Sequence, residues 1–154
     1  MYKKDEIKEL KGIFWQKFEG RMKKIRSMNN GNKINWQHYR TNIHHVYFRL
    51  ETNDNDLKLC IDLQHRDKGI RELFYQQFIE VKTVMQSFFK DELVFQENYL
   101  HPNGLEISRI YVELKNVNYL NEEEHDQTIQ FFEKNLRALD KFWTEYQDLF
   151  FQLK

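Results

Sequence analysis

The chain has 154 residues with 24 Lys or Arg and 24 Asp or Glu, so its zero net charge gives no general argument for binding nucleic acid or membranes. Hydrophobic residues make up 40% and aromatic residues 16%, which excludes a disordered chain and indicates a single globular domain over residues 1–154. No stretch approaches the ~20 apolar residues that cross a bilayer, and the first residues lack the apolar core of a signal peptide, so we expect a soluble cytoplasmic protein.

Residues 5–25 have the spacing of an amphipathic helix, and turn-forming residues at 27–32 end it. From residue 46 the period changes to two, and alternating runs at 46–51 and 57–64 predict a β-hairpin with one buried face. The apolar positions are even-numbered in the first strand and odd-numbered in the second, so paired residue numbers must sum to an odd value. A sum of 109 places Glu51 opposite Lys58, an attractive cross-strand pair, and is the register that we predict.

Residues 68–90 carry an apolar stripe and are predicted to form a second helix that begins after Asp67. A second hairpin follows, with strands at 93–99 and 105–114 around a turn of Pro, Asn and Gly. Asn121 and Glu124 have the spacing of an N-cap and its reaching acid, so a last helix is predicted over 122–152. The α-ββ-α-ββ-α order predicts an α+β fold, in which an antiparallel sheet of two hairpins has three helices packed on its apolar face.

Four phrases occur in order along nearly the whole chain: INWQHYRTNIHHVYFRL, DLQHRDKGIRELFYQQFIEVK, ISRIYVELKNV and LRALDKFW. With them the sequence resembles an uncharacterised bacterial family of domains of unknown function. That family includes free-standing members and C-terminal modules of larger proteins with restriction-endonuclease-like domains. The resemblance implies a setting of nucleic-acid processing or phage defence, and it supplies no catalytic residues.

Charge is divided unevenly along the chain. Residues 1–40 hold eleven Lys or Arg against four acids, a net charge of +7, so the remaining residues carry −7. Cations beside aromatic groups suit single-stranded nucleic acid, which offers phosphates and stacking bases. The ligand-binding candidates are Lys23, Lys24, Arg26, Trp36, His38, Tyr39, Arg40 and His44. The alternative, which we prefer, is that Trp36 and Tyr39 plug the end of the sheet while the lysines form a solvated helix face. For the division of charge, the preferred reason is that the two oppositely charged parts of the folded chain attract each other.

Histidines near the first hairpin raise the question of a metal site. Asp62 and His65 lie three residues apart near a loop, and neutral imidazole is a common metal ligand. However, no H-E-x-x-H spacing occurs, and His44 and His45, as neighbours in a strand, would point to opposite faces. We therefore expect no resident metal and no cofactor.

A reduced metal-dependent nuclease is the alternative function. Nucleases of the restriction type place one carboxylate on a hairpin strand and an acid-x-Lys pair on the next, where the acids hold Mg²⁺. Glu51, Asp62 and Gln64 fit this plan, with Gln in place of Lys, and are the catalytic candidates; Mg²⁺ would be required only in this case. In the competing interpretation these charges line the solvated face of the hairpin, and arginines such as Arg109 pair with acids such as Glu51 and Glu113.

The leading hypothesis is a small non-enzymatic binding module whose partner is a nucleic acid or a protein, without membrane contact. The sequence contains no Gly-rich phosphate loop and no G-x-S-x-G elbow, so it gives no support to nucleotide hydrolysis or serine-hydrolase chemistry. Whether the chain is an enzyme at all is left open between this hypothesis and the nuclease.

Overall fold

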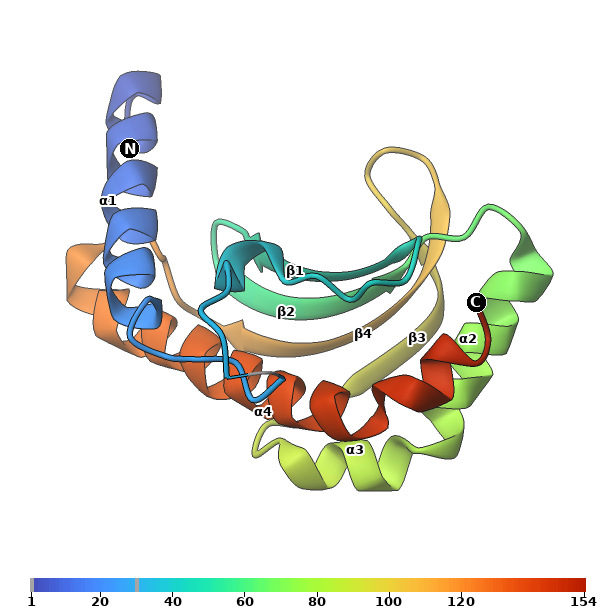
Figure 1. Cartoon of the computed structure of the whole chain (residues 1–154). Coiled ribbons are helices and arrows are strands. Elements are labelled where there is room, and N and C mark those ends of the chain that lie inside the picture. The colour runs from blue at the N-terminus through green and yellow to red at the C-terminus, as the bar shows by residue number, and fades with distance from the viewer. Residues whose placement is uncertain (1, 30) are drawn as a thin grey trace.

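A computed structural model describes residues 2–29 and 31–154 of the chain. The described residues form a curved antiparallel sheet that packs against a long helix, with further helices around it (Figure 1). In chain order the elements are α1 Lys4–Met22, the short 3₁₀ helix η1 Trp36–His38, β1 Val46–Thr52, β2 Asp56–Leu63, α2 Lys68–Glu80, α3 Lys82–Phe88, β3 Val94–Leu100, β4 Glu106–Lys115, the 3₁₀ helix η2 Glu122–Glu124 and α4 His125–Phe151. The predicted α+β class is therefore confirmed.

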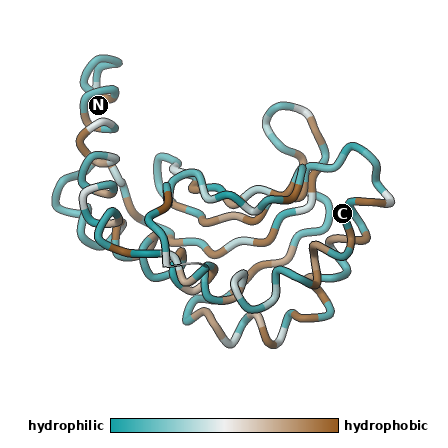
Figure 2. Tube along the Cα trace, in the orientation of Figure 1, coloured by the Kyte–Doolittle hydropathy of each residue, from teal (hydrophilic) through white to brown (hydrophobic). Residues whose placement is uncertain are grey.

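The two hairpins join through their inner strands, which gives the sheet order β1-β2-β4-β3 with every neighbouring pair antiparallel. The predicted register of the first hairpin is confirmed, because Glu51 lies opposite Lys58 and every other pair has the same sum. The Lys58 Nζ–Glu51 Oε2 distance of 3.5 Å shows the expected attraction. Hydrophobic and hydrophilic residues alternate along the strands (Figure 2), so one face of the sheet is apolar and the other polar.

The prediction of one helix over 68–90 is wrong, because the chain leaves helical geometry at Val81, where φ is −102° and ψ is 13°. Because of this break, two helices, α2 and α3, pack along α4 in place of one. Phe78 of α2 packs on Phe150 with ring centroids 4.2 Å apart, and Phe88 of α3 packs on Phe142 at 5.8 Å. Periodicity alone does not reveal such a kink. The described residues thus form four α-helices instead of the three predicted.

The apolar face of the sheet is covered chiefly by α4, whose Trp143 meets Phe48 of β1 edge to face at 5.2 Å. In contrast to the prediction that all helices pack on the sheet, α1 packs on α4 beside it (Figure 1). Phe18 of α1 lies 6.0 Å from Phe132 of α4. Because α1 stands at the flank of the sheet, the segment that connects it to β1 has to cross α4 and the end of the sheet. Hollows lie along that crossing, near the predicted binding residues.

Helix ends differ from the predicted ones by a few residues. The first helix ends at Met22 instead of residue 25, and the last α-helix begins at His125, preceded by the turn η2 whose Glu123 N–H is capped by Asn121. Among the helices of the described residues, none combines the length and the apolar character that crossing a membrane requires.

Candidate functional site

The connection between α1 and β1, residues 23–45, contains most of the predicted ligand-binding residues, and we call it the basic segment. It is fastened to α4 by one buried carboxylate, that of Asp140. Ser27 Oγ and Tyr39 Oη donate to Asp140 Oδ1, both at 2.6 Å, and the Met28 N–H donates to Oδ2 at 2.7 Å. Burial and the adjacent Asp140 raise the pKa of Tyr39, so this hydroxyl remains a donor. Three donors on one carboxylate thus fasten the basic segment to α4 at residues 27–28 and again at residue 39.

The two aromatic candidates point inward. Trp36 is only 3% exposed, and its Nε1 donates to the Ile25 carbonyl at 3.1 Å. Tyr39 is half-buried between Trp36 and Phe48, with ring centroids 6.1 and 5.2 Å away. Trp36 and Tyr39 therefore plug the end of the sheet, as the preferred interpretation expected. The structure contradicts the alternative in which Trp36 offers an open face to a base, because a ring in the core cannot also stack on a ligand.

The cationic candidates point outward. Lys23, Lys24, Arg26 and Arg40 are exposed, as are His38, His44 and the neighbouring Lys33. Within residues 2–29 and 31–154, no carboxylate lies within 4.0 Å of any of these Lys or Arg side chains. Of the eleven cations in residues 1–40, Arg21 alone has such a partner in the part of the chain that is described, namely Glu133 at 2.5 Å. The attraction expected between the two parts of the chain is thus not made through ion pairs at the basic segment.

Three hollows that share lining residues follow the basic segment. The first, of about 360 Å³, lies between α1 and residues 33–37 and is bordered by Lys23 and Lys33. The second, of about 400 Å³, shares Lys33 with the first and reaches His38 and Arg40. The third, of about 470 Å³, shares Arg40 with the second and continues along residues 39–47 past His44. Lys23, His38, Arg40 and His44 therefore line neighbouring hollows, whereas Lys24 and Arg26 line none of the three.

The histidines do not assemble a metal site. His44 and His45 precede β1 instead of lying in it, and His45 has a positive φ of 69°, so the expectation that they occupy opposite faces of a strand is wrong. His65 stacks on Phe74 with ring centroids 4.6 Å apart. Burial, with the nearby His45 and Arg71, lowers the pKa of His65 to about 4, so its ring is neutral at pH 7. No group of three or more His, Cys, Asp or Glu suited to a metal occurs among the described residues.

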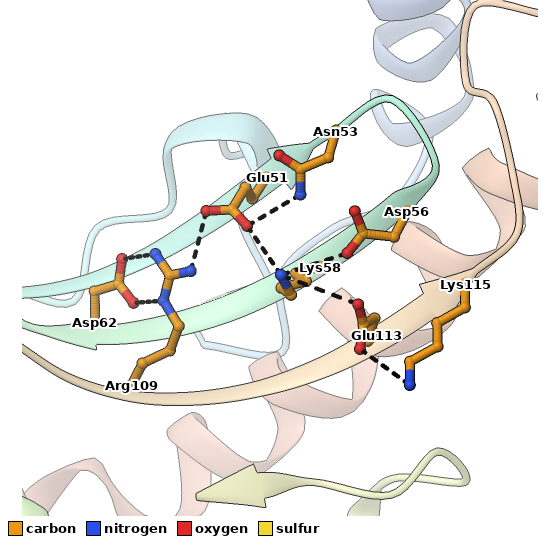
Figure 3. A network of polar contacts seen from close by, with 8 residues as sticks. All are labelled: Glu51, Asn53, Asp56, Lys58, Asp62, Arg109, Glu113 and Lys115. Atoms are coloured by element: carbon orange, nitrogen blue, oxygen red, sulfur yellow. Dashed lines mark hydrogen bonds and ion pairs between the residues drawn. The ribbon is translucent and has the colours of Figure 1, made fainter. Parts of the chain in front are cut away.

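Two of the three catalytic candidates, Glu51 and Asp62, lie on the polar face of the sheet, and Arg109 of β4 occupies the space between them (Figure 3). Arg109 Nε and Nη2 donate to the two carboxylate oxygens of Asp62 at 2.8 and 3.0 Å, and Nη1 donates to Glu51 at 3.0 Å. Asp62 and Arg109 are 0% and 2% exposed. Gln64 follows β2 and borders a separate hollow with His65. The guanidinium thus lies between the two carboxylates to which the nuclease hypothesis assigns Mg²⁺.

A second cation completes the network on this face. Lys58 Nζ lies 3.4 Å from Asp56, 3.5 Å from Glu51 and 4.0 Å from Glu113. Burial disfavours the charge on Lys58, but Asp56 and Glu51 outweigh it and raise the pKa of Lys58. Burial likewise opposes the charge on Glu51, but Arg109 outweighs it and lowers the pKa of Glu51. Every acid of the network thus lies within 4.0 Å of a cation of the same network, which favours a structural role for these charges.

Residues 10–147 match the family model described as Domain of unknown function (DUF4268). The chain belongs to this family. No curated protein matches the DUF4268 chain. The match covers the sheet, all four α-helices in whole or in large part, and the complete basic segment, so the features described above lie within the DUF4268 domain. The family description carries no activity, and the geometry is what supports a function.

Asp140 and the main partner of Arg109 were not predicted from the sequence of this DUF4268 domain. Asp140 interrupts the apolar stripe of the last helix, between Leu139 and Phe142, and a charged residue in such a position signals a buried polar contact. The role of Arg109 was predicted only generally, as a pair with an acid such as Glu51. Its main partner, Asp62, is on the other hairpin, so the pairing depends on β2 lying beside β4, which no local pattern reveals.

Proposed function

We propose that the domain is a non-enzymatic binding module that contacts the phosphate backbone of a single-stranded nucleic acid through the basic segment. The observation that carries the proposal is that Lys23, Lys33 and Arg40 are exposed and line neighbouring hollows, with no carboxylate within 4.0 Å of them among the described residues. Cations that the fold leaves unpaired are free to neutralise a polyanion. The implied setting of nucleic-acid processing or phage defence agrees with such a partner.

The expected recognition is electrostatic. Because Trp36 is buried, stacking contributes little, and affinity arises from phosphate contacts that are independent of base sequence. Such contacts release counterions, so log Kd changes with log salt by roughly 0.7 per contact on a single strand. Three to five contacts by the basic segment predict a slope of about −2 to −3.5 for log affinity and weak binding at physiological salt.

The test is fluorescence anisotropy of a labelled deoxythymidine oligomer, titrated with the protein at several salt concentrations. The variant Lys23→Ala/Lys33→Ala removes two cations that border the first hollow, and it should lower the magnitude of the slope by about 1–2. The matched control is Lys8→Ala/Lys11→Ala, which removes two exposed lysines from the other end of α1.

Equal slopes for wild type and both variants would contradict the proposal, as would the absence of any salt-dependent binding by the wild type. Circular dichroism of each variant checks that the fold is retained. Since all four lysines are exposed and lack ion pairs within the described residues, stability should change by less than about 0.5 kcal/mol.

A further inference from the structure

A separate hollow of about 700 Å³ lies on the other side of α4, between this helix and the end of α3, and we call it the α3–α4 groove. Its floor is apolar and includes the half-buried Phe88 and Leu114 together with the buried Phe131. Its rim is formed by polar and charged side chains of the loop after α3 and of α4. The cations of the rim are Lys90, Lys134, Arg137 and Lys141.

The rim carries an excess of positive charge. Its two acids are already occupied, since Asp91 lies 3.0 Å from Lys134 and Glu133 lies 3.5 Å from Arg137. Glu133 also accepts from Arg21 of α1 at 2.5 Å. Lys90 and Lys141 are exposed, and no carboxylate of the described residues lies within 4.0 Å of either. This local excess contrasts with the net charge of −7 over residues 41–154 as a whole.

The α3–α4 groove adjoins the basic segment. Asp140, which holds Ser27 and Met28, immediately precedes Lys141 on α4, so the two surfaces meet across one helix. Figure 1 shows the segment after α1 lying against α4, with α3 below it. Arg21 and Arg137 share Glu133 at the junction of α1 and α4 and add two cations between the surfaces. A belt of cationic side chains thus passes from the basic segment around α4.

We propose that the α3–α4 groove is a second subsite for the same nucleic-acid strand, with Lys90 and Lys141 contacting phosphates and the apolar floor receiving a base. This inference rests on the proposed function, because a strand must first be held by the basic segment. It assigns the domain a binding site longer than the basic segment alone, so a long strand binds more tightly than a short one. At 0.1 M salt each additional phosphate contact corresponds to about a fivefold gain in affinity.

The experiment compares deoxythymidine oligomers of about 6 and about 16 nucleotides, lengths that fall near the ends of the range for small single-strand sites. For the wild type we expect the longer strand to bind about 5- to 25-fold more tightly at 0.1 M salt. This gain is counted after correction for the larger number of positions at which a longer strand can bind. The variant Lys90→Ala/Lys141→Ala should abolish that gain and leave affinity for the short strand within about twofold. The control variant Lys8→Ala/Lys11→Ala should retain the gain, because α1's first turns lie away from the α3–α4 groove.

The two proposals fail in different ways. If the short strand binds with the expected salt dependence but the longer strand gains nothing, or gains equally in Lys90→Ala/Lys141→Ala, the second subsite is overturned and the proposed function stands. If neither strand binds, both are overturned. A polyglutamate peptide serves as the competing probe. One further result would overturn the nucleic-acid subsite and assign the groove to an acidic protein partner. In that case the wild type binds the peptide, Lys90→Ala/Lys141→Ala does not, and the length of the DNA strand has no effect on its affinity.

Discussion

Replacing Asp140 by Ala is expected to release the basic segment from α4. The carboxylate is 1% exposed and accepts three hydrogen bonds from Ser27, Met28 and Tyr39, at 2.6–2.7 Å. Without it, these donors remain buried and unsatisfied unless the segment opens to water. Opening of the segment costs less free energy than keeping the three donors buried without an acceptor. The reason is that the Gln147–Asn29 contact is one of few other polar contacts that hold the segment on α4.

The size of the destabilisation by Asp140→Ala follows from these three hydrogen bonds. A hydrogen bond to a charged group contributes about 1.5–3 kcal/mol, so three of them set an upper limit of roughly 4.5–9 kcal/mol. Opening of the segment returns the three donors to water and reduces the loss. We therefore expect Asp140→Ala to lower the free energy of unfolding by about 2–4 kcal/mol. Asp140→Asn, which keeps one neutral acceptor, should lie between the wild type and Asp140→Ala.

Urea denaturation followed by circular dichroism measures this change. Asp148→Ala is the matched control, since this acid lies on the same helix, is exposed and accepts no side-chain hydrogen bond in the described structure. Hydrogen exchange should show faster exchange in residues 27–39 of Asp140→Ala than in the wild type. If Asp140→Ala were as stable as Asp148→Ala within about 0.5 kcal/mol, the carboxylate would not fasten the segment and the reasoning would be refuted.

Three other predictions concern the core, the pH dependence and the nuclease alternative. Phe78→Ala should cost ~3–5 kcal/mol, because its ring is 0% exposed, and a denaturation midpoint near that of the wild type would contradict its packing. The unfolded chain protonates His65 near pH ~6.5 but the folded chain only near pH 4, so stability should fall as the pH drops through this range. His65→Phe, which preserves stacking on Phe74, should lose less stability over the same pH range. If the variant lost as much stability as the wild type, the pH dependence would arise from other groups. With Mg²⁺ or Mn²⁺ we expect no nicking of DNA or RNA, because Arg109 occupies both oxygens of Asp62; nicking that disappears in Asp62→Asn would establish the alternative instead.

Short-range patterns predicted the first hairpin down to its register. Apolar alternation restricted the register to odd sums, and the Glu51–Lys58 pair selected the one that the structure has. The same kind of reasoning located the basic segment, because charge and turn residues are visible without a fold. The inward direction of Trp36 was one of two interpretations, since burial of a ring depends on what the rest of the chain places beside it.

Long-range contacts could not be predicted in the same way. The pairing of β2 with β4, the Asp62–Arg109 pair and the anchoring of residues 27–39 by Asp140 all join residues that are far apart in sequence. The break at Val81 depends on the shape of α4, which offers separate positions to Phe78 and Phe88. Each of these features is decided by tertiary packing, which overrides the local periodicity on which the helix over 68–90 was based.

The sheet order has a consequence for synthesis of the chain. Each hairpin is local and can form within microseconds, but residues 63 and 108 must meet before the two hairpins become one sheet. The helix that covers the apolar face, α4, follows all four strands and is 27 residues long. At ~5–20 residues per second a ribosome needs about 1–5 s to make it. During that interval the apolar face of the sheet is not yet covered by α4, so hairpins of neighbouring nascent chains can pair through the inner edges of β2 and β4 before α4 is complete.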